Sequence, residues 1–152
     1  MHRKLFREIL DGLAGALNLP GISTSEDGCT ALIEVDGFEL CLRCIPQGFV
    51  VLFAVVAPFP VKNKAEVARE LLDANTLYYR TQGFTLGARK DTGVTLQGVI
   101  SLRVVDQNSI RTFVENFLNV AEYWQEFCQS KGGGQEAAHM PDELLNMLSM
   151  SV

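Results

Sequence analysis

The sequence predicts an α+β domain: a helix, a three-stranded meander, a second helix, a two-stranded hairpin and a third helix, with the helices packed on a twisted antiparallel sheet. Three stretches carry this prediction. Asp36-Gly37 stands between two apolar-rich runs and is the strongest short signal for a hairpin turn. Residues 49–57 read FVVLFAVVA, without a polar side chain. Residues 69–94 predict the end of a helix, a glycine that terminates it, a short strand and a turn; their sequence is RELLDANTLYYRTQGFTLGARKDTGV.

The composition fits one folded domain, because 47% of the 152 residues are hydrophobic and 20% are charged. A formal net charge of −5, without a Lys/Arg cluster, argues against a nucleic-acid partner, since phosphate binding needs a basic surface. The start, MHRKLFREILDGLAGAL, has charges within its apolar stretch and predicts an amphipathic helix rather than a signal peptide. No run is long enough to span a membrane. We therefore expect a cytoplasmic protein with no membrane partner and with reduced cysteines.

The first helix has one apolar stripe and ends at Pro20-Gly21. A two-residue turn at Asp36-Gly37 then fixes the pairing of the first hairpin. The pairs predicted on one face are Val35 with Phe38, Ile33 with Leu40, Ala31 with Leu42, and Cys29 with Cys44. The other face has Leu32 opposite Cys41 and Glu34 opposite Glu39. Two opposed glutamates are tolerated if the turn end of the hairpin is exposed to solvent or contacts a basic group.

The apolar strand 49–57 implies that both faces of the sheet are covered at least part of the time, because an antiparallel strand with one wet face alternates. The helices cover one face. We expect a partner to cover the other, while a central strand enclosed by the protein's own helices stays an open alternative. The length of the Pro46-Gln47 turn decides which residues face outward. Two residues place Val50, Leu52 and Val56 outside; one residue more places Val51, Phe53 and Val55 there.

The second half of the domain follows from the same periodicities. Residues 62–79 form the second helix, with Ala65, Ala68, Leu71, Leu72 and Asn75 along one side. A hairpin spans 84–104, where Gly98 indicates a bulge or a close backbone approach. Asp106, Asn108 or Ser109 can cap the third helix, whose stripe is Ile110, Phe113, Phe117, Ala121, Trp124 and Cys128.

Residues 1–130 are expected to form the domain and residues 131–152 a flexible tail. Lys131-Gly132-Gly133-Gly134 reads as a hinge, and Pro141 to Glu143 can start a short amphipathic helix containing Leu144, Leu145, Met147 and Leu148. A frayed tail is the expected state of the isolated protein.

No motif points to catalysis, a metal or a cofactor. Cys41 and Cys44 form a CxxC, but residues three apart in a strand point to opposite faces, and the two histidines lie near the chain ends. The sequence contains no phosphate-binding glycine loop, and its serines, histidines and acids are too scattered for a triad. We therefore expect no enzyme, no cofactor, no metal and no disulfide.

The stretch 69–94 contains LLxxN, then GxxLG, then a TG turn before an alternating strand, and the third helix carries Ala121-Glu122 and Trp124. These motifs and the order of elements, from Leu5 to Phe127, resemble the class I type III secretion chaperones, the family of the translocated intimin receptor chaperone. The resemblance implies a homodimer without ATPase activity. Such a chaperone binds the N-terminal chaperone-binding region of a secreted effector in extended form and keeps it soluble and competent for secretion. A contact with the secretion ATPase stays open.

By the same resemblance, Leu71, Leu72, Asn75 and Tyr79 become the dimer candidates. The candidates for the effector-binding surface are Leu32, Cys41, Ile45, Val50, Leu52 and Val56. Two alternatives remain. One is a regulatory adaptor of the same fold outside secretion, like the YbjN-like proteins. The other is a small-molecule binding protein or enzyme, which needs an enclosed pocket with converging polar groups.

Overall fold

A computed structural model describes residues 1–132 and 140–149. In chain order the elements are α1 (His2–Ala16), β1 (Ser23–Thr24), β2 (Thr30–Val35), β3 (Phe38–Ile45), β4 (Phe49–Ala57), α2 (Lys64–Ala74), the 3₁₀ turn η1 (Thr76–Tyr78), β5 (Thr85–Arg89), β6 (Gly93–Ser101), α3 (Gln107–Ser130) and α4 (Asp142–Ser149). The predicted α+β order is confirmed. Two short elements, β1 and η1, were not predicted. The expectation of a flexible tail falls partly on 133–139 and 150–152, which lie outside the described residues.

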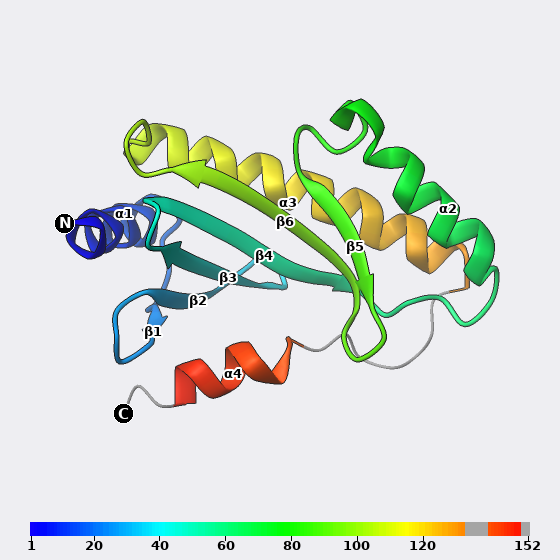
Figure 1. Ribbon diagram of the computed structural model, residues 1–152, viewed down its shortest axis with the longest axis horizontal. Helices are drawn as coiled ribbons and strands as arrows, with labels where there is room; N and C mark the ends of the chain where they lie inside the picture. The colour runs from blue at the N-terminus through cyan, green and yellow to red at the C-terminus, as the bar shows by residue number, and fades with distance from the viewer. Residues whose placement is uncertain (133–139, 150–152) are drawn as a thin grey trace.

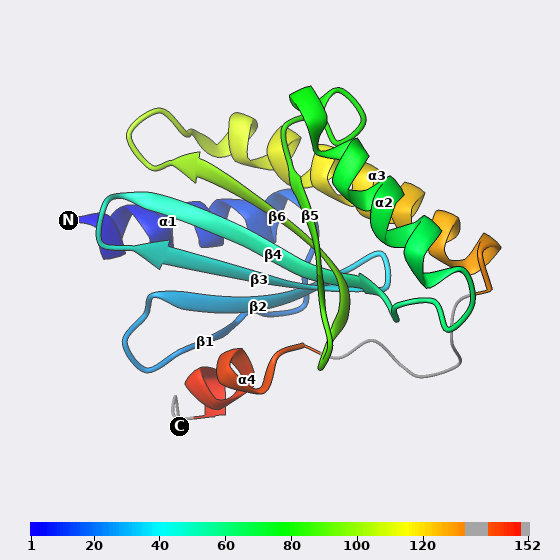
Figure 2. The same ribbon diagram turned by 45° about the vertical axis from the view of Figure 1, so that its right-hand side comes forward.

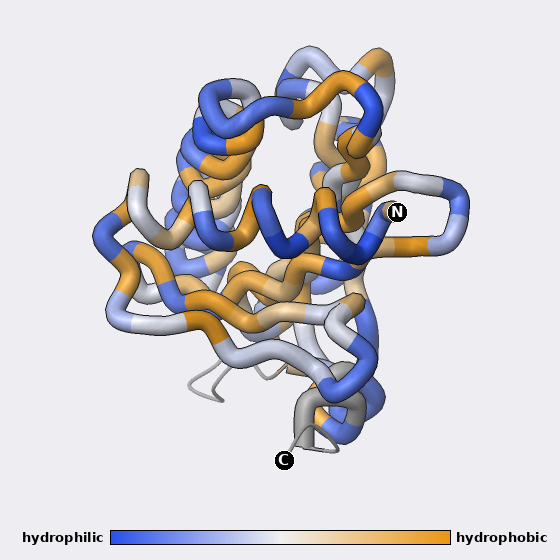
Figure 3. The backbone as a smooth tube through the Cα atoms, turned by 90° about the vertical axis from the view of Figure 1, so that its left-hand side faces the viewer, coloured by the Kyte–Doolittle hydropathy of each residue, from blue (hydrophilic) through white to orange (hydrophobic). Residues whose placement is uncertain are grey.

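The described strands form one antiparallel sheet in the order β1-β2-β3-β4-β6-β5, so β1 and β5 are its two edges (Figure 1). Turning the molecule shows that α3 and α4 lie on opposite sides of the sheet, while α2 lies next to β5 (Figure 2). The face toward α1 and α3 is called the inner face below, and the opposite one the outer face. In Figure 3 apolar residues run through the strands, and many polar residues lie on the outer sides of the helices.

The first hairpin has the predicted register. Val35 pairs with Phe38, Leu32 with Cys41 and Glu34 with Glu39. Asp36 and Gly37 both have positive φ, at 51° and 81°, as a two-residue turn that follows the twist of the strands requires. Turn chemistry and hydrophobic pattern thus agree, and a slip by one residue would move every core side chain into water.

The second turn differs from the first expectation. Ile45 pairs with Phe49, so the loop consists of the three residues Pro46 to Gly48, with Gly48 at a φ of 83°. A three-residue loop of this kind takes glycine in the left-handed region. The extra residue reverses the faces of β4.

The expected outward position of Val50, Leu52 and Val56 is therefore wrong. All three are buried in the core cluster on the inner face. Val51, Phe53 and Val55 point outward instead, as the alternative turn length predicted. Of the predicted effector-binding residues, only Leu32, Cys41 and Ile45, which belong to β2 and β3, lie on the outer face.

The core lies between the inner face and the helices. Its largest buried side chains include Phe6, Leu13, Leu40, Leu42, Leu52, Leu96, Phe117 and Trp124. Gly98 shows a close approach rather than a bulge, because an added Cβ would come within 2.6 Å of the Phe84 ring. Phe84 packs edge-on against Phe113 and Phe117 at 5.2 Å. The sheet's irregularity lies instead between Val55 and Ala57.

Two helix ends differ in how well they were predicted. Asp106 caps α3: its carboxylate accepts the backbone N–H of Ser109 at 2.7 Å, and the Ser109 hydroxyl accepts the N–H of Asp106 at 2.8 Å. The second helix was expected to reach Tyr79, but α2 ends at Ala74. Leu77 and Tyr78 both have φ of 57°, a left-handed conformation that breaks the helix and turns these side chains outward.

Candidate protein-binding surfaces

The outer face of the sheet is an apolar surface that α1, α2 and α3 leave uncovered. The pairing brings Cys41 beside Leu32 and Phe53, and Val51 between Arg43 and Val99. Its other apolar members are Ile45, Phe49 and Val55. Phe49 and Val99 are exposed, with 57% of Val99 open to water. An exposed contiguous apolar patch on a sheet is typical of a surface that binds another chain.

Three of the six predicted effector-contact residues, Leu32, Cys41 and Ile45, lie on this face. Their role stays a prediction. Val51, Phe53 and Val99 join them, and the apolar character of all of β4 was the sequence signal for the first two. Val99 was not predicted because the outward positions of its strand are otherwise polar, and Gly98 interrupts the inward row beside it.

One end of the outer face is acidic. Glu34 and Glu39 are directly opposed and exposed beside the Asp36-Gly37 turn. They line a cleft of about 390 Å³ that also involves Val55, Gln125 and Met140. The opposite end, with Phe49 and Val99, is open and apolar. The face therefore changes from acidic to apolar along the strands.

A second surface consists of exposed apolar side chains at the end of α2, in η1 and directly after η1. Leu72 is 72% exposed, Leu77 86% and Tyr79 71%. We call these three residues the α2–η1 patch. Leu77 was not predicted, because helical spacing alone could not show the left-handed turn that directs it into water.

The other two predicted dimer residues are engaged within the protomer. Leu71 is buried in the core. The Asn75 side chain clamps the edge strand β5: its amide nitrogen donates to the carbonyl of Leu86 at 2.9 Å, and its oxygen accepts the N–H of Leu86 at 2.8 Å. These bonds satisfy main-chain groups on an edge strand, which otherwise invite another strand.

Arg80 holds the region of the α2–η1 patch against α3. Its guanidinium contacts Glu70 at 3.2 Å and Asp73 at 3.4 Å and lies 5.2 Å from the centre of the Trp124 ring. A partly buried arginine stacked on an indole is more firmly placed than a surface ion pair. The patch is therefore presented on a fixed support.

A third feature is a charged groove of about 820 Å³ between α1 and the loop after β1. Arg3, Lys4 and Arg7 line it from α1, and Asp27 from the loop. The Ser25 hydroxyl donates to the Asp27 carboxylate at 2.6 Å and lowers the pKa of that carboxyl. The groove adjoins β1, an edge strand of the sheet.

The four cysteines are free thiols in the structure. Cys41 faces outward and Cys44 belongs to the core, so the CxxC does point to two faces as expected. Burial raises the pKa of Cys41 and of Cys128 to about 11. Within residues 1–132 and 140–149, His, Cys, Asp and Glu side chains do not gather in groups of three or more that would suit a metal.

The comparisons with known proteins agree with this architecture. The model of the Tir chaperone protein (CesT) family matches residues 8–125. The chain belongs to this family. No curated protein matches the chain in sequence. No helix among the described residues has the length and apolar character needed to cross a membrane.

Three solved structures show how far the family fold is shared. The ExsC–ExsE complex aligns at a TM-score of 0.72 with 25% identity, over 84% of this chain and 96% of that one. The HopA1–SchA chaperone–effector complex aligns at 0.65 with 18% identity, over 82% and 95%. The Yersinia pestis type III secretion chaperone SycH with a fragment of YscM2 aligns at 0.61 with 16% identity, over 81% and 98%.

Proposed function

We propose that this protein is a type III secretion chaperone. It binds the N-terminal chaperone-binding region of an effector in extended form and keeps that effector soluble and ready for secretion. The observation that carries the proposal is the apolar outer face, where β4 is as apolar as on its core side. Family membership supports it, and so does the fold shared with chaperone structures that contain a partner.

The mechanism is recognition without covalent chemistry. Apolar side chains of an extended segment pack on Val51, Phe53 and Val99, and each fully buried side chain contributes about 1.5–3 kcal/mol. Ordering the segment opposes this gain, so a large wrapped surface is needed for tight binding. The bound segment cannot fold or aggregate through the same apolar residues. No enzymatic step or cofactor is part of this proposal, and the place of action is the cytoplasm.

The α2–η1 patch is proposed as the contact between two copies of the chain. Its three apolar side chains are among the most exposed in the described part of the protein, and they sit on a helix end anchored by Arg80. Burying Leu72, Leu77 and Tyr79 against their own copies would form a self-complementary interface, as a two-fold dimer requires. Leu71 and Asn75 then support this surface from within.

Co-expression with N-terminal segments of candidate effectors, followed by purification of the complex, tests the function. Val51→Asp is the informative variant. In the free protein the carboxylate stands opposite Arg43, so the sheet tolerates it. In the complex it would be desolvated beneath the effector, and a cost of about 3 kcal/mol weakens binding roughly 100-fold.

Val104→Asp is the matched control, because Val104 is an exposed valine outside the sheet. It should bind like the unchanged protein. Equal affinity of the Val51→Asp variant for a segment that binds the unchanged protein would remove the outer face from the mechanism. A partner that binds only as a folded domain would favour the adaptor of the same fold instead.

A further inference from the structure

The segment that follows the domain is not separate from it. Met140 is only 8% exposed, and Pro141 is buried as well. Met140 lines the cleft at the acidic end of the sheet, together with Glu34 and Glu39 from the first hairpin and Gln125 and Gln129 from α3. A methionine fills irregular apolar gaps well. Burial of this kind marks a docked segment.

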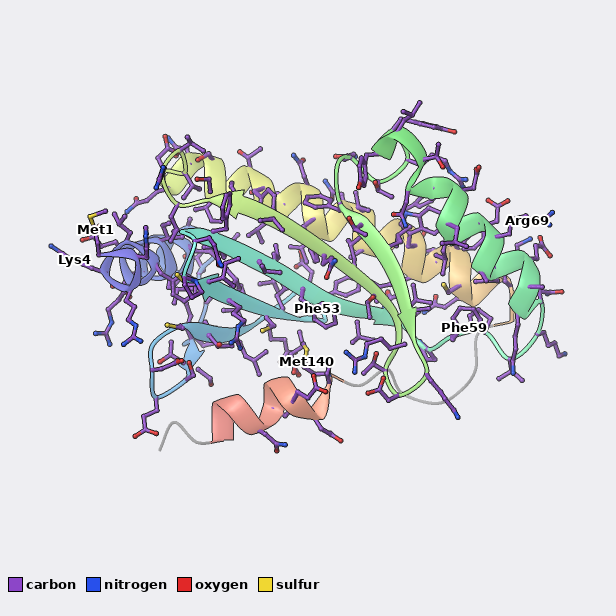
Figure 4. All side chains as sticks on the ribbon, in the orientation of Figure 1. Met1, Lys4, Phe53, Phe59, Arg69 and Met140 are labelled. Carbon is purple, nitrogen blue, oxygen red and sulfur yellow. The ribbon has the colours of Figure 1, made fainter. Side chains whose placement is uncertain are left out.

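Helix α4 continues from this anchor on the side of the sheet away from α3 (Figures 1 and 2). In the described part of the chain its main contacts are with β2. Asp142, Glu143 and Asn146 are exposed, and the Glu143 carboxylate lies 4.0 Å from the Arg89 guanidinium. Figure 4 places Met140 on the same side of the sheet as Phe53. The segment 140–149 therefore lies where the outer face begins.

Burial on the outer face is concentrated at one position, Cys41. Cys41 belongs to the outer face, yet only 1% of it is exposed. At the far end of the same face Val99 is 57% exposed, and Phe49 is exposed too. Without a cover, a small side chain on a wet sheet face is expected to meet water. Leu32 and Phe53, which flank Cys41, are partly exposed, so the cover lies over Cys41 rather than over a whole half of the face.

We propose that residues 140–149 are an internal occupant of the outer face, which an effector segment must displace in order to bind across β2, β3 and β4. The proposal rests on the function proposed above. The exposed side chains Phe49 and Val99 offer the first contact. Cys41, between Leu32 and Phe53, becomes available when the segment leaves. In the free chaperone the segment shields apolar surface that would otherwise promote aggregation.

The expected size of the effect follows from population arithmetic. If the segment is docked in nine molecules of ten, removal of its docking tightens the apparent Kd for an effector segment about tenfold. Because the occupant is tethered to the domain, this competition does not depend on protein concentration. Release also exposes Cys41, whose thiol then ionises more readily and reacts faster with alkylating reagents.

Alkylation of the full-length protein with N-ethylmaleimide, followed residue by residue with peptide mass spectrometry, tests the docking without any effector. Met140→Asp places a carboxylate in a buried site beside Glu34 and Glu39, so the segment should leave. Cys41 should then react up to about tenfold faster. Met140→Leu preserves an apolar anchor of similar size and should protect Cys41 like the unchanged protein.

Cys128 is the internal reference, because it is fully buried on α3 and reacts only when the domain opens. Faster alkylation of Cys41 with an unchanged rate at Cys128 supports local release. If Cys41 in the Met140→Asp variant is alkylated as slowly as Cys128, the proposal is overturned, because the neighbouring strands alone then cover Cys41. Parallel acceleration at both cysteines overturns it too, since Met140 would then hold the whole domain together.

The second arm measures the Kd of a purified effector segment for the same two variants. Met140→Asp should bind about tenfold more tightly than Met140→Leu. Equal affinities, with Cys41 uncovered in the first variant, would show that the segment docks without competing, and the proposal would be wrong. If no effector segment binds any form of the protein, the proposed chaperone function fails while the alkylation result stands by itself.

Discussion

Asn75 provides the sharpest test of how the protomer divides its surfaces. The family pattern suggested a dimer contact, whereas the structure gives its side chain two hydrogen bonds to the backbone of Leu86, at 2.8 and 2.9 Å. We expect Asn75→Ala to destabilise the folded protomer and to leave its association unchanged. Loss of a clamp on β5 lowers the free energy of unfolding, whereas loss of a dimer contact weakens association. Measuring both quantities therefore separates the two roles.

The magnitude follows from the two bonds. Each contributes about 0.5–1.5 kcal/mol net, and water can partly replace the amide at the edge of β5, so a loss of about 2 kcal/mol is expected. For a chain of this size that loss lowers the Tm by roughly 4–8 °C. Asn75→Asp should recover little at neutral pH, because it keeps the acceptor for the Leu86 N–H but sets a carboxylate against the Leu86 carbonyl.

Urea unfolding gives the free energy, and amide hydrogen exchange gives the local effect, since the Leu86 N–H should lose protection before the core strands do. Light scattering over a concentration series reports association. An unfolding free energy within about 0.5 kcal/mol of the unchanged protein would refute the clamp. Loss of the dimer with stability retained would return Asn75 to the interface.

Two further predictions concern the α2–η1 patch and the start of α3. Leu72→Asp should give a monomer in light scattering at micromolar concentration, because the new charge would be buried unpaired between two copies, while Val104→Asp should not; a Leu72→Asp dimer would rule out this patch. Asp106 has its pKa lowered by the backbone N–H of Ser109, so it stabilises the fold above about pH 4 and this contribution is lost as the pH falls through the lowered value. Asp106→Asn keeps a capping oxygen but does not titrate. The urea midpoints of the two proteins should therefore differ at pH 7 and converge in acid. A difference that stays constant with pH would contradict the stabilising role of the ionised Asp106 carboxylate.

Much of the fold could be predicted because local signals and the hydrophobic pattern agree. Asp36-Gly37 admits one favourable turn, and the opposed apolar pairs confirm its register independently. The next loop lacked this second check. Since every residue of β4 is apolar, both turn lengths gave an acceptable core, and the pattern could not reject the wrong one. A strand that is apolar on both sides thus predicts an apolar outer face but does not show which side chains form it.

The candidate surfaces were harder to predict for a different reason. Leu71 and Leu72 are adjacent and chemically alike, yet one is in the core and the other in water. Periodicity places both near the same side of a helix, and only the packing of α2 on β5 separates them. Asn75 shows the same limit, because its partner Leu86 is eleven positions away and belongs to a strand whose position depends on the tertiary fold.

The surface proposed for pairing lies beside β5, where α2 packs, while α4 packs mainly on β2 (Figure 1). The two are not fully separate, because the Glu143 carboxylate of α4 lies 4.0 Å from the Arg89 guanidinium at the end of β5. A dimer joined through Leu72, Leu77 and Tyr79 uses no residue of the outer face or of the cleft that Met140 lines. Each protomer can then release its own segment without breaking the dimer. Because an effector long enough to cross both faces would have to displace two segments in turn, binding to the first copy holds the chain near the second and makes the second displacement easier.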